Sequence, residues 1–229
     1  YPQEQLMRDC RITMIYEGTN GIQSMDLLGR KLGMKKGKLV MDLMGEIMAV
    51  TGAAKAIESN KGFAVKVEEA LNKLGEVAMH LGKTAMSEKV LSAFAFSYPF
   101  MEVCGDVVMA WMLLWRASVA APLLEKLAGG FDPEVRRTAA EKNKNAAFYE
   151  GQIRSAEYFI QAVLPVTYGK MKAIMTSCNA AVEIPEAPVD GTLYRVLFLC
   201  AVLLFLLTFA LNTAAELVRQ NLRKRYGRL

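Results

Sequence analysis

The chain has 229 residues, 53% of them hydrophobic, and it carries a formal net charge of +5 at pH 7. The basic excess lies beyond Leu211, where five Arg and Lys side chains stand against one Glu, so residues 1–211 keep 23 of the 28 basic and 22 of the 23 acidic side chains. Residues 1–211 are so close to neutral that they lack the basic excess of a nucleic-acid-binding protein, and this function is excluded. Four scattered Cys residues and one His exclude a disulfide framework and a zinc site, and predict buried, reduced, structural thiols.

The first 32 residues are predicted to form a helix end, a loop and a new helix. The apolar stretch 12–16 is followed by Glu-Gly-Thr-Asn-Gly at 17–21, where Gly and Asn permit left-handed backbone and end the regular structure. After this loop Ile22, Met25, Leu28 and Leu32 follow at helical spacing, which predicts a new helix.

Four further helical stretches are predicted, at 38–58, 62–86, 88–127 and from Asp132 onward. The third is expected to be kinked or divided near Pro99 and Pro122. The fourth begins where Asp132 can cap a helix and Pro133 takes the first helical position. It then carries an apolar seam whose residues follow each other in steps of three and four: Ala146, Tyr149, Ile153, Ala156, Ile160 and Val163. The helix is expected to bend or end at Pro165, and helical character to resume to about residue 182.

These stretches predict an all-α fold, an antiparallel helical bundle. Core packing explains the seam and the many Met residues better than a cofactor-binding stripe does. His80 is interpreted as a residue on a helix face and not as an acid or base.

The composition changes at a linker spanning 183–191, which is rich in Pro and acidic residues. From Val196 to Ala215 there follow 20 residues without a charge, about 30 Å of helix, the thickness of a bilayer's hydrocarbon core. A single transmembrane helix is therefore predicted, with a buried core helix as the alternative. Tyr194 marks one interface, and the basic end places Leu229 in the cytoplasm.

The N-terminal residues resemble the C-terminal signature of the acyl-CoA dehydrogenase family. The resemblance lies in Arg8-Asp9, in the string IYEGTNGIQ from Ile15 to Gln23, and in the string DLLGRKL from 26 to 32. Within the family, the chain resembles the longer bacterial members, which carry an extra helical C-terminal domain. The expected domains are 1–37, the end of the catalytic domain with the Glu-Gly-Thr motif; 38–187, the C-terminal helical domain; and 188–229, the transmembrane helix with its basic cytoplasmic tail.

The resemblance implies FAD-dependent α,β-dehydrogenation of an acyl-CoA thioester. This chemistry needs a base for the α-proton while the β-hydrogen leaves as hydride to flavin. By resemblance, Glu17 is that catalytic base, Gly18 lies against the acyl-CoA substrate, and Thr19, Asn20 and Gly21 contact FAD. Shorter family members often have Ser-Gln where this chain has Asn20-Gly21. On composition alone, Glu17 would be a solvated loop carboxylate, and Arg8 with Asp9 an exposed ion pair at a helix end.

The resemblance also implies an electron-transferring flavoprotein as electron acceptor, a homo-oligomer, and a cytoplasmic location for the dehydrogenase part, within fatty acid metabolism. The chain corresponds to a C-terminal fragment, which we expect to be inactive alone.

The tail from Leu203 to Arg219, with its basic end at 222–226, resembles the last transmembrane helix of a phosphate ABC transporter permease. A cytoplasmic Leu229 would place the dehydrogenase part on the outer side of the membrane, away from acyl-CoA, so the two parts conflict. The alternatives to the enzyme are therefore a phosphate-transport permease subunit or a membrane-anchored helical module, with the two parts joined as a chimera.

Overall fold

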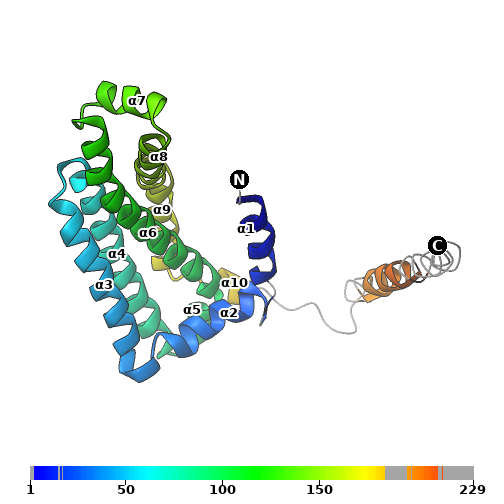
Figure 1. Cartoon of the computed structure of the whole chain (residues 1–229). Coiled ribbons are helices and arrows are strands. Elements are labelled where there is room, and N and C mark those ends of the chain that lie inside the picture. The colour runs from blue at the N-terminus through cyan, green and yellow to red at the C-terminus, as the bar shows by residue number, and fades with distance from the viewer. Residues whose placement is uncertain are drawn as a thin grey trace, which may run out of the picture. The chain divides into compact units, whose positions relative to one another are not determined.

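The computed structural model describes residues 3–14, 16, 18–183, 195–196, 198–210 and 213, and every regular element in these ranges is helical (Figure 1). The predicted all-α class is confirmed. The chain divides into two compact units, Tyr1–Val182 and Glu183–Leu229. The domain boundaries expected from the sequence, which separate residues 1–37 from 38–187, remain a prediction.

The first unit begins with α1 (Gln3–Cys10), a 3-10 turn (Arg11–Met14), and α2 (Asn20–Asp26), which continues into a π-helical turn (Leu27–Lys31). A second 3-10 turn (Met34–Gly37) leads to the bundle, and Lys35, Lys36 and Gly37 all have positive φ there. The remaining helices are α3 (Lys38–Lys55), α4 (Lys61–Ala85), α5 (Val90–Ala95), α6 (Ser97–Ala128), α7 (Pro133–Lys142), α8 (Lys144–Tyr158), α9 (Leu164–Met175) and α10 (Ala180–Glu183).

Helix α6 is the centre of the bundle and packs against α2, α3, α4, α8 and α9. Successive long helices run in alternating directions (Figure 1), as predicted for an antiparallel bundle. Eleven residues of α6 are buried, among them Phe100, Val107 and Leu114. Small Ala residues at 110, 117, 120 and 121 are also buried, which lets neighbouring helices approach closely.

The helix boundaries correct the sequence prediction in two places. The stretch 88–127 divides at Phe96, close to Pro99 as predicted, but it does not divide at Pro122, which lies inside α6. The stretch that begins with the Asp132 cap, whose Oδ1 accepts from Glu134 N at 3.0 Å, ends at Lys142 instead of running on to Pro165. Asn143 is the N-cap residue of the next helix, α8, because its Oδ1 accepts a hydrogen bond from Asn145 N at 2.9 Å. Pro165 lies in the first turn of α9, where it is tolerated.

The predicted seam does face the core. Ala146, Ile153, Ala156 and Ile160 are buried, and Tyr149 is half-buried. The expectation of buried thiols is contradicted for three of the four Cys residues. Only Cys104 is largely enclosed, and burial raises its pKa to about 12, whereas Cys10, Cys178 and Cys200 are exposed.

One ion pair is nearly enclosed between α7 and α8. Arg136 Nε and Nη2 donate to the two carboxylate oxygens of Glu150 at 2.8 and 2.6 Å, and their side chains are 9% and 16% exposed. Arg154 Nε also donates to Glu150 at 2.8 Å, and the guanidinium of Arg136 lies 4.6 Å from the ring centre of Phe131. Burial alone would raise the pKa of Glu150, but the hydrogen bonds and charges of the two Arg side chains outweigh it and hold the pKa below its ordinary value.

Glu150 should therefore stabilise the fold in a pH-dependent way. Because its folded pKa is depressed, its contribution is present above the unfolded pKa, about 4.3, and is lost as the pH falls through the lower folded value. We expect Glu150→Gln to lower the free energy of unfolding by about 1–3 kcal/mol at pH 7, and by progressively less below about pH 4. Denaturant unfolding at several pH values measures this difference.

The matched control is Glu141→Gln, since Glu141 forms an exposed pair with Arg137 at 3.5 Å. Its expected cost is below about 0.5 kcal/mol at every pH. Equal effects of the two substitutions, or a Glu150→Gln cost that does not change with pH, would contradict the role given to Glu150.

Two described helices bear on the predicted membrane span. Helix α6 is long and apolar enough to cross a membrane by length and composition, but it is the core helix of the bundle. In the second unit, Phe198–Ala210 is a shorter apolar helix, and all of its side chains are exposed except Val202, which is half-buried. The predicted span, Val196–Ala215, includes positions 197, 211, 212, 214 and 215, which lie outside the described residues, as do Tyr194 and Leu229.

Candidate active-site motif

The predicted catalytic residue, Glu17, lies outside the described residues, as does Ile15. The chain is described on both sides of it. Tyr16 is exposed, and its N–H donates to Ile12 O at 2.8 Å, which closes the turn after α1. Gly18 then leads directly into the turn that begins α2.

Gly18 has a backbone conformation that favours glycine. Its φ is +121°, and a Cβ placed there would come within 3.4 Å of Ile22 Cγ2 and 3.5 Å of Gln23 Nε2. These distances are ordinary van der Waals contacts, so the positive φ, and not a lack of space, is what would strain a side chain at this position. The glycine therefore permits the backbone turn with which the motif enters the helix.

The next three motif residues form the beginning of α2. Thr19 is the N-cap residue: its Oγ1 accepts from Ile22 N at 3.5 Å, and its carbonyl accepts from Gln23 N at 3.0 Å. Within the described part of the chain, the N–H groups of Asn20 and Gly21 have no acceptor. Thr19 and Gly21 are exposed and Asn20 is half-buried, so these donors lie near the surface of the first unit.

The sequence analysis missed a buried serine contact that attaches the motif to the bundle. Ser24 Oγ donates to Gly21 O at 2.7 Å and lies 3.2 Å from Ser97 Oγ, at the start of α6. The buried face of α2 includes this serine and only part of the apolar spacing. Ser24 and Leu28 are buried, whereas Ile22 and Met25 are exposed. The sequence signal for this contact was a small polar residue, Ser24, one helical turn before Leu28. Such a residue does not indicate its partner, Ser97, which lies 73 residues further along the chain.

The charged residues near the motif have local partners. Asp26 accepts from Arg30 Nε and Nη2 at 2.6 and 2.8 Å, and these hydrogen bonds lower the pKa of Asp26. Arg8 pairs with Glu4 at 3.2 Å, while Asp9 accepts from Gln5 Nε2 at 2.8 Å. The pair predicted between Arg8 and Asp9 is thus replaced by two exposed contacts within α1.

Other candidate reactive groups lie apart from the motif along the chain. His80 lies on α4, as predicted, and its Nε2 is 2.7 Å from Ser177 Oγ, just beyond the end of α9. Within the described ranges, no group of three or more His, Cys, Asp or Glu side chains could hold a metal ion.

Comparison with known proteins adds the following. The family described as acetyl-CoA dehydrogenase C-terminal like matches residues 42–185. A butyryl-CoA dehydrogenase of Syntrophomonas wolfei is 28% identical over 188 residues, which are 81% of this chain and 28% of that protein. A broad-specificity linear acyl-CoA dehydrogenase of Mycobacterium tuberculosis is 28% identical over 192 residues, 82% of this chain and 29% of that protein.

A 3-methylmercaptopropionyl-CoA dehydrogenase of Ruegeria pomeroyi is 32% identical over 161 residues, 70% of this chain and 24% of that protein. The chain therefore spans less than a third of the length of the curated relatives it matches.

Proposed function

Because this chain belongs to the acetyl-CoA dehydrogenase C-terminal-like family, we propose that it is the C-terminal part of an FAD-dependent acyl-CoA dehydrogenase. The reaction is the removal of two hydrogens from the α- and β-carbons of an acyl-CoA thioester. The observation that supports this most directly is the turn at Gly18, which leads from the position of Glu17 into the capped start of α2. That local structure and the family assignment rest on different parts of the chain, since the family matches residues 42–185.

We assign Glu17 the role of catalytic base. A carboxylate takes the α-proton, and the electron pair left on the α-carbon forms the new double bond as the β-hydrogen departs with its own pair. Gly18, the next residue, has no side chain, so it permits close approach of the acyl thioester to the backbone. The motif thus combines a proton acceptor with a backbone position that leaves room for substrate.

The start of α2 fits a group that carries hydrogen-bond acceptors. The N–H groups of Asn20 and Gly21 lie there without an acceptor among the described residues, and Thr19 and Asn20 add polar side chains. These three residues would hold FAD. When bound, FAD supplies the hydride acceptor. The residues of this chain contribute the proton acceptor and orient the bound groups.

A flavin assay on the full-length protein tests this proposal. We expect the full-length protein to be purified with the visible absorption of oxidised flavin, and to lose that absorption when an acyl-CoA is added without oxygen. The 229-residue chain alone should show no flavin reduction. A full-length protein that binds no flavin, or whose flavin is not bleached by any straight-chain acyl-CoA, would count against the dehydrogenase assignment.

The partners follow from the same proposal. The reduced flavin would pass its electrons to an electron-transferring flavoprotein, and the enzyme would act as a homo-oligomer in fatty acid metabolism. The cytoplasmic location applies to the dehydrogenase part without the tail, because a single span with Leu229 in the cytoplasm places that part on the outer side. The resemblance of the tail to a phosphate permease, and the chimera it suggests, remain predictions from the sequence.

We further propose that Val196–Ala215 crosses a membrane once, with Leu229 on the cytoplasmic side. The exposed apolar side chains of Phe198–Ala210 support this proposal, because such a surface is unfavourable in water. We expect the chain to stay with membranes during alkaline carbonate extraction. A tag after Leu229 should be digested by protease only when the cytoplasmic side is open. Release of the chain by carbonate would contradict the span, and protection of the tag on that side would reverse its orientation.

A further inference from the structure

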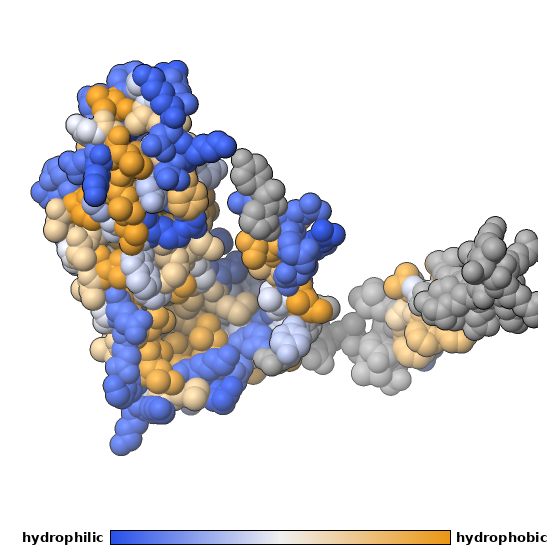
Figure 2. Space-filling view, viewed as in Figure 1, coloured by the Kyte–Doolittle hydropathy of each residue, from blue (hydrophilic) through white to orange (hydrophobic). Residues whose placement is uncertain are grey.

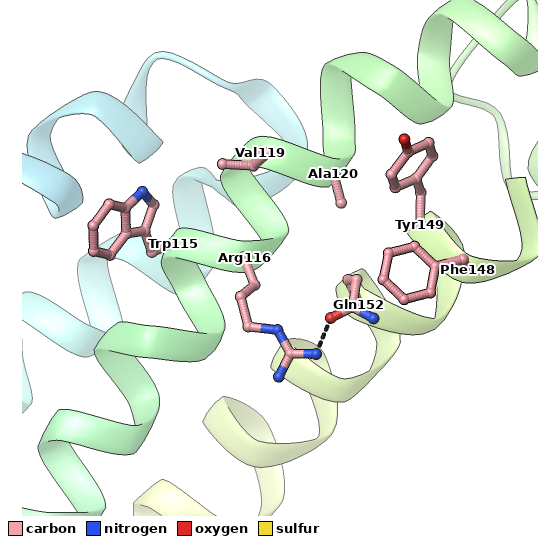
Figure 3. Close-up of a pocket in the computed structure, with 7 residues that line it drawn as sticks. All are labelled: Trp115, Arg116, Val119, Ala120, Phe148, Tyr149 and Gln152. Carbon is pink, nitrogen blue, oxygen red and sulfur yellow. Dashed lines mark hydrogen bonds between the residues drawn. The ribbon is translucent and has the colours of Figure 1, made fainter. Parts of the chain in front are cut away.

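A groove of about 430 Å³ lies between α6 and α8 on the surface of the first unit (Figure 3). Val119 and Ala120 of α6 lie in the middle of the groove. Trp115 lies on one side of them, and the rings of Phe148 and Tyr149 on the other. A volume of this size is in the range of sites for small molecules. None of these residues belongs to the motif at 16–23, so the groove is separate from the proposed active-site residues.

The groove presents an apolar lining to solvent. Trp115, Val119 and Phe148 are 49%, 56% and 61% exposed. Hydrophobic patches are also visible among the hydrophilic residues of the bundle in the space-filling view (Figure 2). In the groove the aromatic rings have fixed neighbours, because Trp115 stacks on Trp111 at 6.0 Å and Phe148 meets Tyr149 edge to face at 5.7 Å. A cluster of exposed apolar side chains whose rings are held by neighbouring rings is typical of a binding site.

One cation lies within this apolar lining. Arg116 Nη2 donates to Gln152 Oε1, and this hydrogen bond joins α6 to α8 (Figure 3). Among the described residues, Arg116 has no carboxylate partner, whereas Arg136 and Arg154 both pair with Glu150. The guanidinium therefore keeps donors available for an anion beside hydrocarbon and aromatic surface.

We propose that this groove binds a single-tailed anionic amphiphile. Its carboxylate or phosphate head is held by Arg116, and its hydrocarbon tail lies on Trp115, Val119 and Phe148. The charge and the apolar lining together select this class, because an uncharged alkyl chain leaves the Arg donors without a new partner and a cationic one is repelled by them. The site goes beyond the proposed dehydrogenase reaction, which uses other residues.

Tryptophan fluorescence provides a direct test, since the two Trp residues of the chain are Trp111 and Trp115. The full chain in nanodiscs, free of detergent, is titrated with decanoate, decyl phosphate, decanol and decyltrimethylammonium below their micelle concentrations. We expect saturable changes with one or both of the two anions, and the tighter of them identifies the head group. Arg116→Gln should weaken anion binding at least about tenfold. Arg137→Gln, which removes the same charge from α7, should leave it unchanged.

A second substitution tests the apolar part of the site. Val119→Glu places a carboxylate in the groove and should abolish anion binding in a protein whose circular dichroism matches the unmodified chain. The proposal is overturned if neither anion gives a saturable signal, if decanol or the cationic amphiphile binds as tightly as decanoate and decyl phosphate, or if Arg116→Gln behaves like Arg137→Gln.

Discussion

Glu17→Gln should lower the turnover of the full-length enzyme about 10²–10⁴-fold, the usual contribution of a general base. Gln has nearly the same size and polarity as Glu, but it cannot take the α-proton. The flavin should still bind, because the residues proposed to hold it, Thr19, Asn20 and Gly21, are unchanged. The measurement is the rate of flavin bleaching by a saturating acyl-CoA without oxygen, compared with the unmodified enzyme.

The matched control is Glu4→Gln, which removes a carboxylate from the exposed pair with Arg8 on α1. It should leave the bleaching rate within about twofold, since exposed pairs of this kind contribute little. If Glu17→Gln bleaches its flavin at the normal rate, the catalytic base is another residue. If it has lost its flavin, Glu17 has a role in the cofactor site and the rate cannot be compared.

Phe100→Ala should lower the free energy of unfolding of the first unit by about 3–5 kcal/mol. Phe100 is 1% exposed near the start of α6, three residues after Ser97, which contacts Ser24. Its removal takes a large apolar surface out of the core and leaves a cavity, because the surrounding helices cannot collapse fully. Denaturant unfolding followed by circular dichroism measures the change.

Phe148→Ala is the comparison of choice, because the same side chain is 61% exposed on α8. It should cost less than about 1 kcal/mol. Equal losses for the two substitutions would mean that Phe100 is not in a closed core, and would contradict the central place of α6 in the bundle.

The candidate motif was only partly predictable from the sequence. The sequence predicted a break in regular structure at 17–21 with left-handed backbone at glycine, and Gly18 has a positive φ, whereas the capping role of Thr19 emerged only from the structure. The buried face of α2 could not be read from the apolar spacing. That spacing includes Ile22 and Met25, which are exposed, but the helix buries Ser24 against Ser97. Such a pairing depends on where α6 begins, and no local pattern in residues 20–31 contains that information.

The sequence by itself determined the all-α class, the capped start of α7 and the apolar seam of α8, because these depend on residues within one or two helical turns of each other. Tertiary structure alone decided which helix becomes the centre and which thiol is enclosed. It also decided how Arg136 meets Glu150, and how Arg116 of α6 meets Gln152 of α8 beside a groove. These features require side chains from different helices to meet. Their energies come from burial and complementary charge between elements, which are set only when the helices pack.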